Sequence, residues 1–241
     1  MNDFENLMSE IVEFVECENS EELSKEIKLV SEKQSTYKSK HKYNLEKFFN
    51  LQIEEHIRVA NRSNDILCKP FVNSVKICIE CLKKSGKLLI FGNGGSAADA
   101  QHLSTELTVR FSKNRNAIAA ISLATDTSAL TAIGNDFGFE FIFSRQVQAL
   151  GCSGDVAIGI STSGKSRNII NGFKEAKKMG LKCIAFTGRN IEALKKHSDE
   201  IISVPATNTS RIQEMHIMIG QMLCNAIEYK LGLTRLVKEE D

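Results

Sequence analysis

The chain lacks an excess of charge of either sign. Its 241 residues include 31 Lys and Arg against 30 Asp and Glu, which gives a net charge of +1. A nearly neutral protein has no general attraction for nucleic acid or for anionic lipid headgroups, both of which bind strongly basic surfaces. We therefore expect neither a nucleic acid nor a membrane among its partners.

Long hydrophobic stretches are also missing. No apolar run approaches the roughly 20 residues that a membrane-spanning helix needs. The first residues, MNDFENLMSEIVEF, are acidic, whereas a secretory signal needs a basic start followed by an apolar core. These two absences predict a cytoplasmic protein.

The seven cysteines do not follow the pattern of a disulfide framework. Their number is odd and they are scattered through apolar surroundings, which favours reduced thiols in the core. Cys78 and Cys81 do form a C-x-x-C motif. No second pair lies nearby and the spacing falls inside an amphipathic helical pattern, so core packing is favoured over a metal or redox role.

Length and composition fit one α/β domain with an added N-terminal segment. The content of 42% hydrophobic and 25% charged residues is ordinary for a globular protein. Residues 1–42 run from an acidic stretch through a lysine-rich one to the polar segment QSTYKSKHK. We predict short helices near 4–15 and 21–30, an extension and linker over 1–42, and the main domain over 43–241.

Short apolar strands alternate with helical patterns through the main domain. Helices are expected at 43–62 and 71–85, the second closed by Gly86. The later strands are expected at 87–91, 117–123, 155–160, 182–187 and 200–204, and the later helices from 96 onward and at 127–134, 139–150, 166–179, 191–197 and 210–230. Because these strands are too apolar to have a solvated face, the alternation predicts a parallel sheet covered by helices on both sides.

One stretch, KLLIFGNGGSAADAQHLSTELTVRF at 87–111, combines a strand, a glycine turn and the start of a helix. Glycines let backbone N–H groups approach a ligand, and a helix N-terminus favours an anion such as phosphate. His102 and Glu106 lie four residues apart and share one face of that helix. A glycine turn or a lone histidine is ordinary structure by itself, but their combination predicts chemistry beside a phosphate.

A second anion site is expected in ISTSGKS at 160–166, where a buried strand meets the start of another helix. Ser161, Thr162, Ser163 and Ser166 place four hydroxyls there. One serine would be enough to cap the helix, so four hydroxyls together with a glycine favour phosphate binding at the carboxyl end of the strand.

Four motifs in order carry a family resemblance: GNGGSAADAQHLSTEL, TDTSALTAIGNDFGFEFIFSRQV, GDVAIGISTSGKSRNII and VPATNTSRIQEMHI. Between about 43 and 231 the chain closely resembles the bacterial phosphoheptose isomerases of the sugar isomerase (SIS) family. These enzymes interconvert sedoheptulose 7-phosphate and D-glycero-D-manno-heptose 7-phosphate through an enediol. The resemblance implies a three-layer αβα domain with a five-stranded parallel sheet, a homotetramer with active sites at subunit interfaces, and a role in heptose biosynthesis for lipopolysaccharide or capsule.

The resemblance also implies residue roles. Phosphate contacts fall on Ser161, Thr162, Ser163 and Ser166; contacts with the rest of the substrate fall on Asn93, Gly94, Gly95, Ser96, Glu106, Arg110, Asn135, Asp136 and Gln213. The family's zinc ligands correspond to His102, Glu106, Gln213 and, at the fourth position, Gln221. Glu106 and the residue at 221 are the two catalytic positions, which move protons between C1 and C2.

Gln221 departs from the family, which has histidine there. A primary amide neither gains nor loses a proton near neutral pH, so it cannot act in proton transfer. Its carbonyl oxygen could contact a metal, although such oxygens suit hard cations better than zinc. The nearby His216 is five residues away on a helix and points elsewhere, so we expect it to be structural.

Two functions remain open. The first is an isomerase with Glu106 as its single base, assisted by His102, Gln213 or a metal. The second is a non-catalytic SIS protein that binds a sugar phosphate or a partner, similar to the replication initiator-associating protein, which keeps R-I-Q-E-M-H but lacks both catalytic positions. The retained carboxylate of Glu106 favours the isomerase.

Overall fold

The computed structural model describes Lys28 and residues 44–234 of the chain. The helices predicted near 4–15 and 21–30 and the predicted linker fall outside the described residues, apart from the helical Lys28. Contacts within the chain divide it into two units, 1–52 and 53–241. The boundary predicted after residue 42 stays a prediction.

Strands and helices alternate from β1 onward. The strands are β1 (Leu88–Gly92), β2 (Ala120–Ser122), β3 (Val156–Ser161), β4 (Lys182–Thr187) and β5 (Glu200–Ser203). The helices are α3 (Leu45–Lys83), α4 (Gly95–Thr108), α5 (Thr127–Asp136), α6 (Ile142–Leu150), α7 (Arg167–Lys178), α8 (Glu192–Lys195) and α9 (Thr209–Lys230), with a 3-10 turn η1 at Phe139–Phe141. The strands and helices predicted after residue 86 are all present, with ends shifted by a few residues.

All five strands run parallel in the order β2-β1-β3-β4-β5. The register places Gly92, the last residue of β1, beside Ile160 of β3. The carboxyl ends of the two central strands therefore meet at one edge of the sheet, where open α/β sheets bind their ligands.

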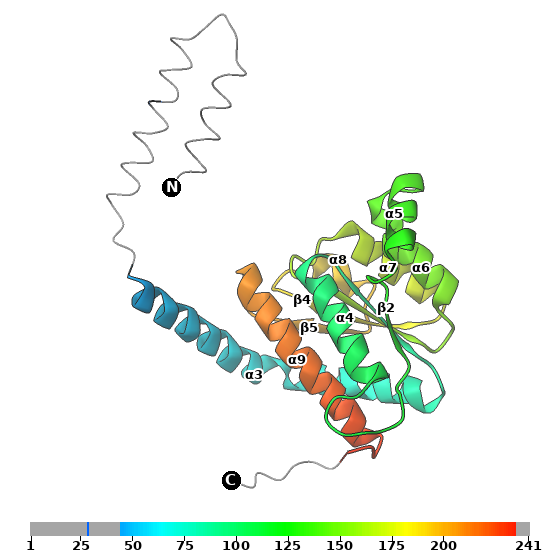
Figure 1. The fold of residues 1–241 in the computed structure, drawn as a ribbon, viewed down its shortest axis with the longest axis horizontal. Coiled ribbons are helices and arrows are strands. Elements are labelled where there is room, and N and C mark those ends of the chain that lie inside the picture. The colour runs from blue at the N-terminus through cyan, green and yellow to red at the C-terminus, as the bar shows by residue number, and fades with distance from the viewer. Residues whose placement is uncertain (1–27, 29–43, 235–241) are drawn as a thin grey trace, which may run out of the picture. The chain divides into compact units, whose positions relative to one another are not determined.

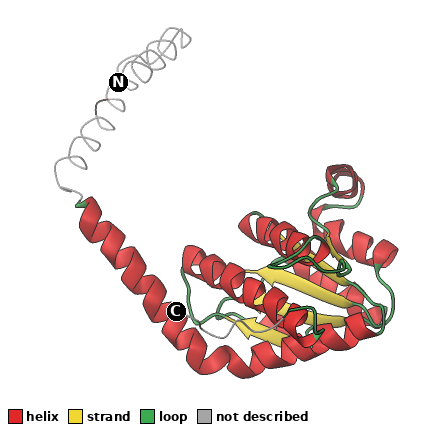
Figure 2. Ribbon diagram, turned by 60° about the horizontal axis from the view of Figure 1, so that its bottom comes forward, coloured by secondary structure: helices red, strands yellow, loops and turns green. Residues whose placement is uncertain are grey.

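Successive side chains of each strand point to opposite faces of the sheet. On β1, Leu88 and Ile90 join a core beneath α3, α4 and α9, whereas Leu89 and Phe91 join a core beneath α6, α7 and α8. The sheet lies between these two helical layers (Figures 1 and 2). The predicted three-layer αβα architecture with a five-stranded parallel sheet is confirmed.

The prediction of two separate helices before β1 is wrong, because α3 is one helix of 39 residues with Pro70 inside it. Proline in a helix interior costs about 3 kcal/mol, since it removes a hydrogen bond and crowds the preceding turn. Leu67 and neighbouring residues of α3 are buried in the core on either side of the proline, and this packing keeps the helix continuous. The helix ends at Lys83, two residues before the predicted end, and the positive φ of 61° after it belongs to Ser85 and not to Gly86, which was predicted to close the helix.

Six cysteines lie in the described part of the chain, and all are free thiols. The buried ones are Cys78, Cys81, Cys183 and Cys224. Burial raises the pKa of Cys81 to about 11 and that of Cys183 to about 12, as expected for inert core thiols. Core packing of the C-x-x-C motif is confirmed, but Cys68 and Cys152 are exposed, so the expectation of a core position is wrong for these two.

None of the helices in the described residues is long and apolar enough to cross a bilayer.

Candidate active site

Two loops meet where β1 and β3 end. We call residues 92–95 the glycine turn and residues 161–166 the serine loop. The Asn93 Nδ2 donates to Asn168 Oδ1 at 2.9 Å, and the Asn168 Nδ2 returns a hydrogen bond to Asn93 Oδ1 at 2.8 Å. Since Asn168 lies in the first turn of α7 and is buried, this reciprocal pair joins the starts of α4 and α7.

The glycine turn leaves its outer side open. Gly94 precedes α4 with a φ of 56°, a conformation that favours glycine, and a Cβ built there would meet no atom within 4 Å. Ser96 is buried behind the turn. A Cβ on Gly95 would collide with the side chain of Gln213, so the absence of a side chain lets α9 place Gln213 against the start of α4.

The serine loop presents hydroxyls at the start of α7. The Oγ atoms of Ser161 and Ser166 lie 3.0 Å apart, and Ser163 Oγ accepts from the Lys165 N–H at 3.2 Å. Ser166 stands at the N-cap position but makes no side-chain capping hydrogen bond. Simple capping therefore does not account for these hydroxyls, and they lie beside backbone N–H groups of α7 that helix geometry leaves unpaired.

Three of the predicted catalytic or metal residues come together between α4 and α9, which pack against each other (Figure 1). His102 Nε2 lies 3.3 Å from Glu106 Oε1 and 3.2 Å from Gln221 Nε2. Their side chains stay accessible, with 43% of His102 and 21% of Glu106 exposed. We call His102, Glu106 and Gln221 the polar cluster. A single ring nitrogen, His102 Nε2, faces both of the other groups.

The polar cluster supplies one proton acceptor, one group that both gives and accepts a proton, and one amide. Glu106 can remove a proton from carbon and His102 can polarise or protonate an oxygen, whereas Gln221 can only hydrogen-bond. The fourth predicted metal ligand, Gln213, contacts Gly95, and no hydrogen bond joins it to the polar cluster within the described residues.

The donor set does not match a zinc site. His102 and Glu106 are ordinary zinc ligands and Gln213 matches a ligand of the family, but the fourth position offers the amide of Gln221 in place of an imidazole. Among the described residues no group of three or more His, Cys, Asp or Glu is placed to hold a metal ion.

Arg110, Asn135 and Asp136 are not brought to the other predicted residues. The Arg110 guanidinium donates to Asn114 Oδ1 at 2.7 Å in the loop after α4. Asn135 Nδ2 donates to Asp136 Oδ1 at 2.8 Å at the end of α5. Within the described chain no hydrogen bond or ion pair links these three to the glycine turn, the serine loop or the polar cluster.

Two further residues of this region, Asn168 and Asp99, were not expected from the sequence, whereas His216 was. Asn168 joins the two loops, and only its place two residues after Ser166 hinted at it. Asp99 lies one turn before His102 on α4, and burial raises the pKa of its carboxyl to about 6. His216 is 1% exposed with Nε2 3.2 Å from the Thr187 carbonyl, so its expected structural role is confirmed; burial lowers its pKa to about 4.

Comparison with known proteins identifies the family. The SIS domain profile matches residues 54–188, more than half of the chain. The chain belongs to the SIS domain family. This SIS protein is 53% identical to the phosphoheptose isomerase of Campylobacter jejuni subsp. jejuni serotype O:6 over 175 residues, which cover 73% of this chain and 94% of the relative.

Two further comparisons match phosphoheptose isomerases as well. The phosphoheptose isomerase of Paramagnetospirillum magneticum is 49% identical over 181 residues, covering 75% of this chain and 94% of the relative. A solved structure of a phosphoheptose isomerase from Neisseria gonorrhoeae matches with a TM-score of 0.72 and 44% identity, covering 77% of this chain and 100% of that chain. The family resemblance found in the sequence is confirmed.

Proposed function

We propose that this SIS protein is a phosphoheptose isomerase. It converts sedoheptulose 7-phosphate to D-glycero-D-manno-heptose 7-phosphate through an enediol, in bacterial heptose biosynthesis. The observation that carries the proposal is the polar cluster, in which Glu106 is held beside His102 on an accessible surface. Relatives of that name, about half identical over more than nine-tenths of their length, support it.

The residues of the chain divide the work between binding and proton transfer. The hydroxyls of Ser161, Ser163 and Ser166 and the N–H groups at the start of α7 bind the substrate phosphate. Glu106 removes a proton from C1, beside the carbonyl, and returns it to C2. His102 gives a proton to the carbonyl oxygen at C2 as the enediol forms and takes the proton of the C1 hydroxyl as the aldehyde forms, so that no proton is gained or lost overall. Gln221 holds His102 through Nε2 and exchanges no proton.

The proposal includes a homotetramer with active sites at subunit interfaces and a cytoplasmic location. Apolar side chains on α3 and α9 support an assembly, since Ile57 and Ile66 are each 52% exposed and Met222 is 48% exposed. Arg110, Asn135 and Asp136 are not linked to the site of their own chain, and in the proposed tetramer they serve the site of a neighbouring subunit.

The decisive assay is incubation of the purified protein with sedoheptulose 7-phosphate, with the product followed by NMR. Glu106→Gln is nearly isosteric but cannot accept a proton, so it should abolish turnover while sugar-phosphate binding persists. Glu192→Gln serves as the control, because Glu192 is 79% exposed on α8 and should leave the rate unchanged.

Gln221→His tests the departure from the family. It would add a nitrogen donor and a group that titrates near neutral pH beside His102, so both zinc affinity and turnover should rise. General acid–base groups contribute about 10²–10⁴-fold, and we expect a gain of at least about tenfold. If sugar phosphate binds but neither the native protein nor Gln221→His turns over a heptose or related ketose phosphate, the protein is a binding protein instead.

A further inference from the structure

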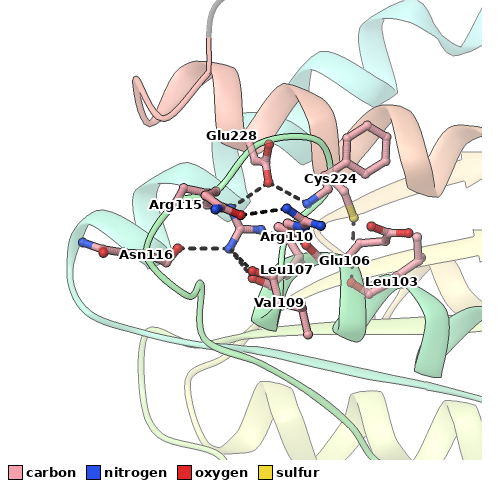
Figure 3. Close-up of polar contacts among 11 residues, drawn as sticks. Leu103, Glu106, Leu107, Val109, Arg110, Arg115, Asn116, Cys224 and Glu228 are labelled. Carbon is pink, nitrogen blue, oxygen red and sulfur yellow. Dashed lines mark hydrogen bonds and ion pairs between the residues drawn. The ribbon is translucent and has the colours of Figure 1, made fainter.

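The loop after α4 carries a buried arginine that the site described above does not use. The side chain of Arg115 is 2% exposed, and its Nε lies 2.6 Å from Glu228 Oε1 on α9, in a side chain that is fully buried. Figure 3 shows the guanidinium between the end of α4 and α9. Separating such a pair would leave a buried charge without compensation, so the two groups stay together in the folded protein.

The same guanidinium closes the C-terminal end of α4. Its Nη2 donates to the Glu106 carbonyl at 2.8 Å and its Nη1 to the Leu107 carbonyl at 2.7 Å. In a longer helix the Leu107 carbonyl would accept from the N–H of Phe111, but that N–H donates to Glu228 Oε1 at 3.0 Å (Figure 3). Arg115, together with the Ile118 N–H that donates to the Leu107 carbonyl at 3.0 Å, therefore takes the place of the next helical turn, where a cation also suits the helix dipole.

The ion pair acts on the residue that carries the base. The backbone carbonyl of Glu106 accepts a hydrogen bond from Arg115, and its carboxylate belongs to the polar cluster. On α9, Glu228 follows Gln221 by seven residues, which is two turns, so both lie on one face of the helix. Two links thus hold the α4 region against α9, two helical turns apart on α9. One is the contact of His102 with Gln221, and the other is the ion pair of Arg115 with Glu228.

We propose that Arg115 and Glu228 form a positioning pair that sets how α4 lies against α9, and thereby where the Glu106 carboxylate meets the substrate. This inference rests on the proposed isomerase activity. The pair contacts neither the substrate nor the reacting atoms, and it acts through the turn that contains Glu106. Disturbing it should lower kcat and leave KM nearly unchanged, because the serine loop lies on other elements.

The test compares Arg115→Lys with a matched ion pair far from the site. Lys87 Nζ lies 2.6 Å from Asp155 Oδ2, whose side chain is 3% exposed, and these residues precede β1 and β3 at the opposite edge of the sheet. Since a misplacement of about 1 Å can cost about 10²-fold in rate, Arg115→Lys should lower kcat by about 10- to 100-fold. Lys87→Met should lower the Tm but leave kcat unchanged.

Two outcomes would overturn the proposal. If Arg115→Lys lowers the Tm as Lys87→Met does and kcat stays at the native value, the pair is only structural. Glu228→Gln keeps an acceptor oxygen and nearly the same shape, so it provides the answer if Arg115→Lys does not fold. It should also lower kcat with KM unchanged, and a native kcat in Glu228→Gln would contradict the positioning role.

A second readout separates this proposal from the proposed activity. If the native protein does not turn over sedoheptulose 7-phosphate, the isomerase proposal fails. The positioning role of Arg115 and Glu228 is then tested by the NMR resonances of the His102 ring, measured at one fixed pH. Arg115→Lys should shift those resonances and Lys87→Met should not. Unchanged His102 resonances in Arg115→Lys and Glu228→Gln would overturn the positioning role.

Discussion

The most informative single atom is His102 Nε2, because it faces a carboxylate and an amide at the same time. It lies 3.3 Å from Glu106 Oε1 and 3.2 Å from Gln221 Nε2. With histidine at position 221, this atom would have a second titrating neighbour; with glutamine it has a partner that fixes its direction only. The substitution thus removes a proton carrier and keeps the contact between the helices.

The hydroxyls of the serine loop can be tested by single-residue changes. A Ser163→Ala/Ser166→Ala double substitution should weaken the binding of sedoheptulose 7-phosphate by about 1–3 kcal/mol, because hydrogen bonds to a charged group are lost. Calorimetry measures the affinity directly. Ser144→Ala on α6, whose hydroxyl donates to the Phe141 carbonyl, is the control, and unchanged affinity in the double variant would count against this phosphate site.

Buried His216 makes stability depend on pH. Burial lowers its pKa from 6.5 to about 4, so the unfolded chain binds a proton between these values that the folded chain does not. The contribution of His216 to stability is complete above pH 6.5 and is lost as the pH falls through about 4. At 1.36 kcal/mol per pKa unit the loss is about 3 kcal/mol.

Denaturant unfolding of the native protein and of His216→Gln between pH 7 and pH 4 measures this contribution. The glutamine side chain does not titrate, so the free energy of unfolding of the variant should fall less steeply as the pH is lowered. Parallel curves for the two proteins would show that His216 is not held neutral in the folded state.

At the scale of elements, the site depends on how closely α4 approaches α9. Gly220 on α9 permits that approach, because a Cβ there would lie 2.7 Å from Leu103 Cδ1 on α4, and Leu103 is 2% exposed. Cys224 Sγ lies 3.9 Å from the Leu103 carbonyl one turn further along α9. The two helices therefore have little room to move apart or together without a change in the polar cluster.

Gly220→Ala should lower both stability and turnover. Because Leu103 is buried, we expect the overpacking cost of about 1–3 kcal/mol to outweigh the gain of roughly 0.5–1 kcal/mol from replacing a helical glycine by alanine. Gly134→Ala on α5 is the matched control, because a Cβ there would meet no atom within 4 Å and should raise the Tm. Thermal unfolding and the isomerase rate of the two variants test the prediction, and a Gly220→Ala protein with native stability and rate would contradict it.

At the scale of the whole molecule, the relatives cover about three-quarters of this chain and nearly all of their own length. The SIS domain can therefore be complete without about a quarter of the chain. Contacts within the chain give the same indication, since they separate 1–52 from 53–241.

Deletion of residues 1–40 should leave a folded oligomer of the same subunit number as the full chain. The predicted helices of this segment are short and charged, and a polar segment follows them in the sequence, so they are expected to lie outside the core. Light scattering after size-exclusion chromatography measures the mass. A monomeric or insoluble product would show that the segment takes part in assembly.

The sequence by itself determined the order of strands and helices, the parallel sheet, both loops at its carboxyl edge and the family. These features follow from local patterns: apolar strands alternating with helical periodicity, the glycines of 92–95 and the hydroxyls of 161–166. Burial of the C-x-x-C cysteines also followed, because their helical spacing marks a face that turns toward the core.

Only the tertiary structure decided which distant residues meet. The resemblance had already placed His102 and Gln221 in one site, but the pairing of Asn93 with Asn168 and the ion pair of Arg115 with Glu228, which join residues at least 75 positions apart, were not expected. No local pattern encodes such pairs, since they depend on how α4, α7 and α9 pack on the sheet. The continuity of α3 through Pro70 has the same origin, because the packing of its buried face outweighs the local cost of the proline.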